Sequence, residues 1–127
     1  YIEPLDLAIC GSRGWPTPDT VSYTEHDEKM YLREQGRLRN SLVEAKKKGA
    51  SKIIMAMHYP PAKVEETEFT RIMQEYGVTQ CVYGHLHGMV AWTNGIKGEH
   101  GGIDYKLVSL DYLGARPKLI YDSEQEM

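Results

Sequence analysis

Apolar and polar positions along this chain follow two periods, one typical of strands and one typical of helices. Residues 5–10 alternate apolar positions with others and end at Gly11, while residues 52–57 form an apolar run that is nearly continuous. Alternation with a period of two is typical of a half-buried strand, and a short continuous run is typical of a strand buried on both faces. A further run, at residues 78–83, is rich in β-branched and aromatic residues. We therefore predict strands at Leu5–Cys10, Lys52–Met57 and Val78–Tyr83.

Helical patterns lie between these strands. Thr24 and Asp27 have the spacing of a capping box, which predicts the start of a helix that continues to about Lys48. A second helix is predicted from about Glu66 to Tyr76, and a glycine follows each helix. The lysine run at 46–48 is expected to be a solvated helix end. The positions expected to face the core are Tyr31, Leu38, Leu42 and Ala45 in the first helix and Phe69, Ile72, Met73 and Tyr76 in the second.

The last part of the chain is rich in glycine. Residues 88–102 are expected to form a loop or ragged hairpin, followed by closing strands at Ile103–Tyr112 and Lys118–Tyr121 and a polar tail. The predicted order is β-α-β-α-β-β-β, an α/β fold that covers residues 1–127 without a dividing linker. Because the first three strands alternate with helices, they are expected to pair in parallel through helical crossovers. Ligands of such sheets bind beyond the carboxyl ends of the strands.

Composition narrows the functional classes. The 127 residues and 14.5 kDa suit one domain, and a net charge of −3 with a pI near 6.0 provides no electrostatic footprint for nucleic acid or an anionic membrane. The apolar runs are far shorter than the ~20 residues of a membrane span. Cys10 and Cys81 fall in predicted strands, where buried thiols are favoured over a disulfide or a metal thiolate. These features point to the cytoplasm. The start at Tyr1 fits either a trimmed terminus or a piece of something longer.

Three of the five histidines stand where a predicted strand ends. His58 follows the second strand and precedes a tyrosine and two prolines, and His85 and His87 lie in the turn Gly84-His85-Leu86-His87-Gly88 after the third strand. Neutral imidazole is the commonest protein ligand of zinc, iron and manganese-type ions. The glycines allow the turn to bend, so that both imidazoles reach one centre or two adjacent centres. His58, His85 and His87 are therefore the candidate metal ligands.

The blocks His58-Tyr59-Pro60-Pro61 and Gly84-His85-Leu86-His87 resemble the two C-terminal signature blocks of the calcineurin-like metallophosphoesterase superfamily. Similarity to predicted bacterial phosphohydrolases of that group extends to residues 9–15, 24–27 and 107–113. The resemblance implies hydrolysis of phosphoric esters by metal-activated water at a dinuclear centre. It implies His58 and His85 as ligands of one ion and His87 as a ligand of the other. The ions would be of the manganese, iron, zinc or nickel class and lie about 3.5–4 Å apart.

The family's N-terminal DxH, GDxxD and GNH blocks are absent from residues 1–127, and no aspartate has the surroundings of a bridging ligand. The chain therefore resembles the C-terminal half of the family's αββα sandwich. Alone, it is expected to hold one ion loosely or none and to be a poor enzyme or none. Its expected partners are a phosphoester substrate in the complete enzyme and either the missing N-terminal half or a second copy.

Two alternatives remain open at this stage. The first is a non-catalytic interaction module, because half of a sandwich leaves an apolar sheet face and a strand edge uncovered. The second is a structural zinc site formed by the histidines alone.

Residues near the predicted strand ends are candidates for substrate contacts. Arg13 lies in a glycine-containing loop after the first strand, where it either contacts a substrate phosphate or pairs with an acid. Tyr59 follows a candidate ligand and is a candidate lining residue. His26 and His100 are expected to be solvated. The two tryptophans are expected to pack or to form cleft walls rather than to act as binding platforms.

Overall fold

The computed structural model describes residues 1–109, 112–114, 116 and 118–122. Its centre is a five-stranded sheet in the order β1-β2-β3-β5-β4. The strands are β1 (Leu7–Ser12), β2 (Lys52–Met57), β3 (Gln80–Tyr83), β4 (Gly98–His100) and β5 (Ile103–Leu107). Strands β1, β2, β3 and β5 run parallel, and β4 joins the edge of β5 antiparallel. The structure is thus mixed α/β with a mostly parallel sheet, as the alternating pattern predicts.

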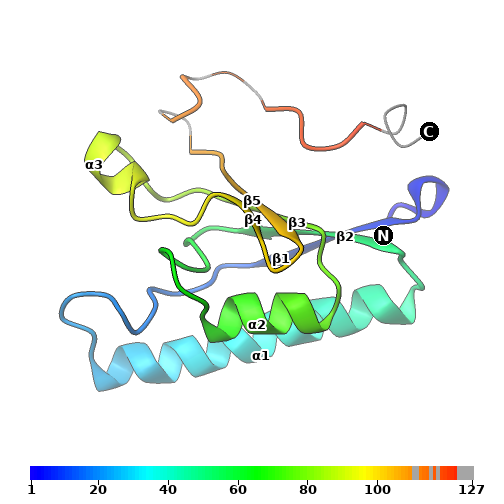
Figure 1. The fold of residues 1–127 in the computed structure, drawn as a ribbon. Helices are drawn as coiled ribbons and strands as arrows, with labels where there is room; N and C mark the ends of the chain where they lie inside the picture. Colours follow the sequence, from blue (N-terminus) through cyan, green and yellow to red (C-terminus); the bar gives the residue numbers. More distant parts are fainter. Residues whose placement is uncertain (110–111, 115, 117, 123–127) are drawn as a thin grey trace.

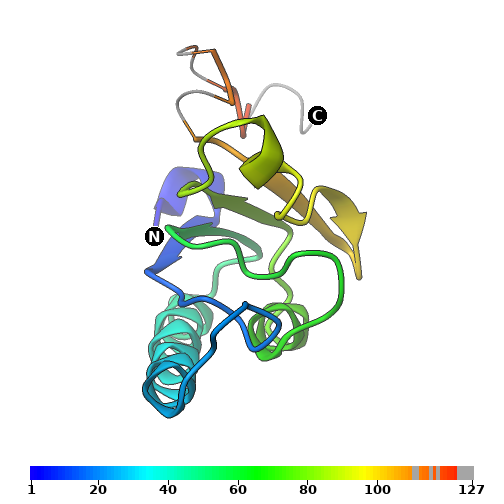
Figure 2. The ribbon, with the colours of Figure 1, turned by 90° about the vertical axis from the view of Figure 1, so that its left-hand side faces the viewer.

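Two longer helices, α1 (Glu25–Lys47) and α2 (Glu68–Glu75), lie side by side on one face of the sheet (Figures 1 and 2). Two short turns complete the regular structure, the 3-10 helix η1 (Glu3–Leu5) and α3 (Met89–Trp92). The predicted capping box at Thr24 is present: its hydroxyl accepts from the Asp27 N–H at 3.2 Å, and the Asp27 carboxylate accepts from the Thr24 N–H at 2.9 Å. Within the described ranges, no helix combines the length and apolar character that crossing a bilayer requires.

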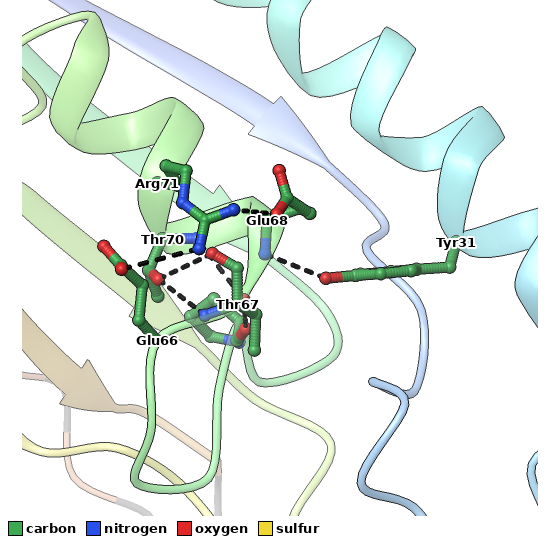
Figure 3. Close-up of polar contacts among 7 residues, drawn as sticks. Tyr31, Glu66, Thr67, Glu68, Thr70 and Arg71 are labelled. Atoms are coloured by element: carbon green, nitrogen blue, oxygen red, sulfur yellow. Dashed lines mark hydrogen bonds and ion pairs between the residues drawn. The ribbon is translucent and has the colours of Figure 1, made fainter.

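A polar cluster at the start of α2 ties the two helices together (Figure 3). Thr67 and Thr70 form a second capping box. The Tyr31 hydroxyl of α1 accepts from the Glu68 N–H at 2.9 Å, which satisfies one of the amide groups that a helix start leaves unpaired. The Tyr31 ring also packs edge-on against Phe69, with ring centroids 4.9 Å apart. Tyr31 therefore fixes the position of α2 against α1.

The core lies between these helices and the sheet. The positions of α1 that were predicted to face the core are all buried. The same is true of α2 as far as Met73, while Tyr76 packs partly buried against the core. Alternate residues of the strands, such as Ile53, Cys81 and Tyr105, meet them from the sheet. Each fully buried large apolar side chain contributes about 1.5–3 kcal/mol, so this layer supplies most of the driving force for folding. Both cysteines are free and buried, and burial raises the pKa of each thiol.

The opposite face of the sheet carries no long helix in the described part of the chain. Leu7 and Ile54 lie on this face opposite residues 119–122, in a segment that runs on the side of the sheet away from the two longer helices (Figure 1). The Gln80 side-chain amide donates to the Ile120 carbonyl at 2.8 Å. A pocket of about 510 Å³ remains between this segment and the sheet. Ile9, on the outer strand β1, is 55% exposed.

The strands near the end of the chain differ from the prediction. Residues 118–121 are not a strand, because this segment is bound by side chains such as Gln80 rather than by a neighbouring strand. The predicted strand at 103–112 ends at Leu107, and residues 110 and 111 lie outside the described residues, as do 123–127 of the predicted tail. A strand that the sequence did not predict, β4, lies within residues 88–102, which were expected to form a loop or ragged hairpin. Gly101 and Gly102 both have positive φ, 59° and 82°, which suits the tight two-residue turn from β4 to β5.

Candidate functional site

The site is built where β2 and β3 end. These strands are parallel neighbours, and their register pairs Met57 with Tyr83. The residues that follow are therefore brought together, and the Gly84 N–H donates to the His58 carbonyl at 3.2 Å. His85 has a φ of 69°, in the left-handed region that a residue with a Cβ rarely adopts. The turn after β3 thus bends its first histidine back toward the end of β2.

His58 and His85 come into direct contact. His58 Nε2 and His85 Nδ1 are 3.2 Å apart, and the ring centroids are separated by 5.0 Å. With metal–nitrogen bonds of about 2.0–2.1 Å, this separation corresponds to a ligand–metal–ligand angle of about 100°, close to the tetrahedral value. The same two atoms can also share one proton as a hydrogen bond. The geometry therefore suits two adjacent nitrogen ligands of a single ion.

The surroundings favour a neutral imidazole at His85. Desolvation lowers the pKa of His85, and the charges of His58 and His87 lower it further. Only the neutral form of a histidine ring has a lone pair for a metal. The lowered pKa therefore keeps His85 neutral, and able to bind a metal ion, down to a lower pH than an ordinary histidine.

His87 is exposed and lies close enough to His85 to influence its pKa. Among the described residues, no group of three or more histidine, cysteine, aspartate or glutamate side chains is arranged to hold a metal ion. Among these residues, His58 and His85 are in contact and His87 lies near enough to act on His85, without a three-residue group that could hold a metal ion. These two imidazoles fit one side of a mononuclear site, whereas two adjacent dications would need anionic ligands between them.

Tyr59 lies against the histidine pair, and its role as a lining residue stays a prediction. Its ring centroid is 4.8 Å from that of His58 and 4.5 Å from that of His85. The loop after β1 packs next to it, because the Tyr59 N–H donates to the Arg13 carbonyl at 3.0 Å. Trp15, from the same loop, has its ring centroid 6.1 Å from that of Tyr59. A continuous aromatic wall therefore leads away from the histidines.

Arg13 pairs with an acid, which is one of the two roles predicted for it. Its Nη2 lies 3.3 Å from Oε1 of Glu34, and the same oxygen accepts from Arg37 Nη1 at 3.0 Å. The Arg13 guanidinium also lies over the Trp15 ring, 4.9 Å from its centroid, and 49% of its side chain is exposed. Contact between the exposed part of the Arg13 side chain and a substrate phosphate stays a prediction.

Glu34 is the residue that sequence reasoning missed. It is fully buried, and Ser12 also donates to its carboxylate, at 3.5 Å. One signal was present: Glu34 stands three residues after Tyr31 and four before Leu38, on the apolar stripe of the helix. A charged residue in that stripe indicates a buried ion pair or a site.

The other two histidines are exposed, as expected. His26 packs its ring edge-on to Trp15 at 6.2 Å, and His100 Nε2 lies 2.8 Å from the Lys97 carbonyl. Trp92 packs partly buried against the core, with its ring 5.2 Å from that of Tyr112. The pocket under residues 118–122 lies at the amino ends of the strands, at the opposite end of the sheet from the histidines.

Comparison with known proteins adds no relative. No family model matches the sequence, and no curated protein or solved structure shows significant similarity to it.

Proposed function

We propose that this chain carries the histidine part of a metal centre that hydrolyses phosphoric esters, as its resemblance to calcineurin-like metallophosphoesterases implies. The observation that supports this most strongly is the 3.2 Å approach of His58 Nε2 to His85 Nδ1 at the carboxyl ends of adjacent parallel strands. Open α/β sheets bind their ligands at this edge. The free thiols of Cys10 and Cys81 suit the cytoplasmic location proposed with this function.

A bound ion of the manganese, iron, zinc or nickel class supplies polarisation of phosphoryl oxygens and activation of water. In this proposal His58 and His85 hold one ion, His87 is a ligand of a second, and Tyr59 walls the site. The left-handed backbone at His85 turns this residue back toward His58. The carboxylate ligands come from outside residues 1–127, from a further segment or from another chain. The 127 residues alone are therefore expected to bind metal weakly and to show little or no turnover.

Metal titration of the 127-residue chain tests the proposal. Zinc and manganese binding would be measured by calorimetry for the wild type and for His58→Ala, His85→Ala and His100→Ala. Removing an outer-shell partner of a metal ligand costs about 10–100-fold in affinity, and losing a ligand should cost at least as much. The two site variants should lose binding, whereas His100→Ala, a histidine on the distant strand β4, should retain it. Equal affinity in all four proteins would refute the metal site.

A second candidate function is a non-catalytic interaction module that forms a dimer. It is favoured by the sheet face without a long helix and by the exposed apolar side chains at its border, Ile9 at 55% and Leu119 at 67%. Light scattering after size-exclusion chromatography would compare the wild type with Ile9→Lys and with Leu32→Lys, an exposed position on α1. A stable dimer that only Ile9→Lys dissociates, in protein that binds no metal, would favour this candidate.

A further inference from the structure

The loop between β1 and α1 places an aromatic and cationic surface beside the histidine pair. The rings of Trp15, Tyr59 and His85 follow one another at centroid distances of 6.1 and 4.5 Å. Trp15 and Tyr59 are both only partly buried. Gly14 allows this approach, since its φ is 70° and a Cβ there would lie 2.8 Å from Met57 Cε. The left-handed Gly14 therefore lets the loop after β1 lie close to Tyr59.

The Trp15 ring is fixed in orientation, and its one polar group is already used. Its indole N–H donates to the Asp27 carboxylate at 3.1 Å, and the Arg13 guanidinium covers one side of the ring. Tryptophan has no other hydrogen-bonding atom. A ligand that meets Trp15 can thus be recognised only through the ring surface, which favours a planar group that stacks.

The same loop also carries charge that suits an anion. Glu34 provides one carboxylate for two guanidiniums, those of Arg13 and Arg37, so this trio keeps one net positive charge. Arg13 is half exposed, while Glu34 is buried behind it. Both guanidiniums are half exposed, so part of the unbalanced charge reaches solvent at Arg13, over the tryptophan ring.

We infer that the ligand of this site is a phosphoester that also carries a planar aromatic ring, with the ring held by Trp15 and Tyr59. Trp15 packs partly buried against the core, as the sequence pattern predicts, and in this inference the rest of its ring surface also meets the ligand. The position of the phosphate, between Arg13 and the histidine pair, rests on the proposed function. A nucleoside and an aryl group both offer this stacking surface, and the experiment distinguishes the two sources.

Binding to the metal-free 127-residue chain tests this inference without any turnover. Dissociation constants would be measured by NMR titration for adenosine 5′-monophosphate, phenyl phosphate and ribose 5-phosphate. Stacking on an aromatic side chain should make at least one ring-bearing ligand bind about tenfold tighter than ribose 5-phosphate. The tighter of the two ring-bearing ligands identifies the source of the ring.

Variants show which side chains cause the preference for ring-bearing ligands. Trp15→Leu and Tyr59→Leu should each reduce it, while Trp92→Leu, at the other tryptophan, should leave it unchanged; thermal unfolding would verify that each variant folds. Equal binding of all three ligands by the wild type would overturn the inference, as would a preference that survives both Trp15→Leu and Tyr59→Leu. The metal titration is an independent test. Zinc binding without a preference for ring-bearing ligands would refute only this inference. A preference for ring-bearing ligands without zinc binding would refute only the proposed metal site.

Discussion

Replacing Glu34 by glutamine removes the one fully buried acid of α1 while keeping its shape. The carboxylate accepts from Arg13 at 3.3 Å, from Arg37 at 3.0 Å and from Ser12 at 3.5 Å, and only 1% of its side chain is exposed. Glutamine retains one acceptor oxygen but adds an NH₂ group, which would face at least one of these three donors. If the NH₂ group faced the arginines, donor would meet donor, and if it faced Ser12, that hydroxyl would have to turn and accept; in either orientation the buried acceptor loses its charge.

The expected loss of stability follows from these contacts. A hydrogen bond to a charged group contributes about 1.5–3 kcal/mol and one between neutral groups about 0.5–1.5 kcal/mol, so each contact that loses the charge is weakened by about 1 kcal/mol. Each ion pair adds less than about 1 kcal/mol, because both guanidiniums are half exposed and solvent screens them. We therefore expect Glu34→Gln to lower the free energy of unfolding by about 2 kcal/mol. For a chain of this size the melting temperature should fall by about 6–10 °C.

Urea denaturation followed by circular dichroism would measure the change. Glu44→Gln is the matched control, since Glu44 lies on the same helix and pairs with Lys47 at 3.3 Å with both side chains about two-thirds exposed. That variant should stay within about 0.5 kcal/mol of the wild type. If Glu34→Gln were as stable as Glu44→Gln, the buried carboxylate would not stabilise the fold and the reasoning about its donors would be wrong.

Three further predictions concern local features. Hydrogen bonds from the N-cap backbone lower the pKa of Asp27. The contribution of Asp27 to stability is therefore present above the pKa of an unfolded aspartate, and it is lost as the pH falls through the lower folded value. Urea denaturation at several pH values should show that wild type and Asp27→Asn differ in stability at neutral pH and that the difference shrinks in acid. Gly95→Ala should cost about 1–3 kcal/mol in thermal unfolding, because a Cβ at Gly95 would collide with the Tyr83 hydroxyl, and an unchanged melting temperature would contradict this contact. Burial and raised thiol pKa values should keep Cys10 and Cys81 unreactive toward a thiol reagent at pH 8 until urea unfolds the protein, and rapid labelling of the folded chain would count against the placement of both strands.

Signals that act over a few residues predicted most of the fold. The capping box at Thr24 marks the start of α1, and the apolar run at Lys52–Met57 coincides with β2 residue for residue. The errors come where such signals were weak or ambiguous. The pair Gly101-Gly102 is a recognisable hairpin turn, yet β4 carries no apolar side chain to mark it as a strand. Residues 118–121 have a strand-like sequence, but a strand also needs a neighbour with free backbone groups.

The sequence predicted where the candidate site lies, but only some of the residues that form it. Placing histidines after parallel strands was enough to expect them at one edge of the sheet. The partner of Arg13 was not predictable, because Glu34 lies 21 residues away and reaches Arg13 only once α1 packs against the sheet.

The sequence by itself determined both longer helices and the strands up to β3, and that three histidines follow strand ends, because capping groups, glycines and apolar periods act on neighbouring residues. Only the tertiary structure decided that His58 and His85, 27 residues apart, touch while His87 does not join them in a three-ligand group. It also decided that both longer helices cover the same face and that Trp15 lies beside Tyr59. These outcomes depend on strand order, register and the left-handed turn at His85, which result from packing across the whole sheet rather than from any one segment.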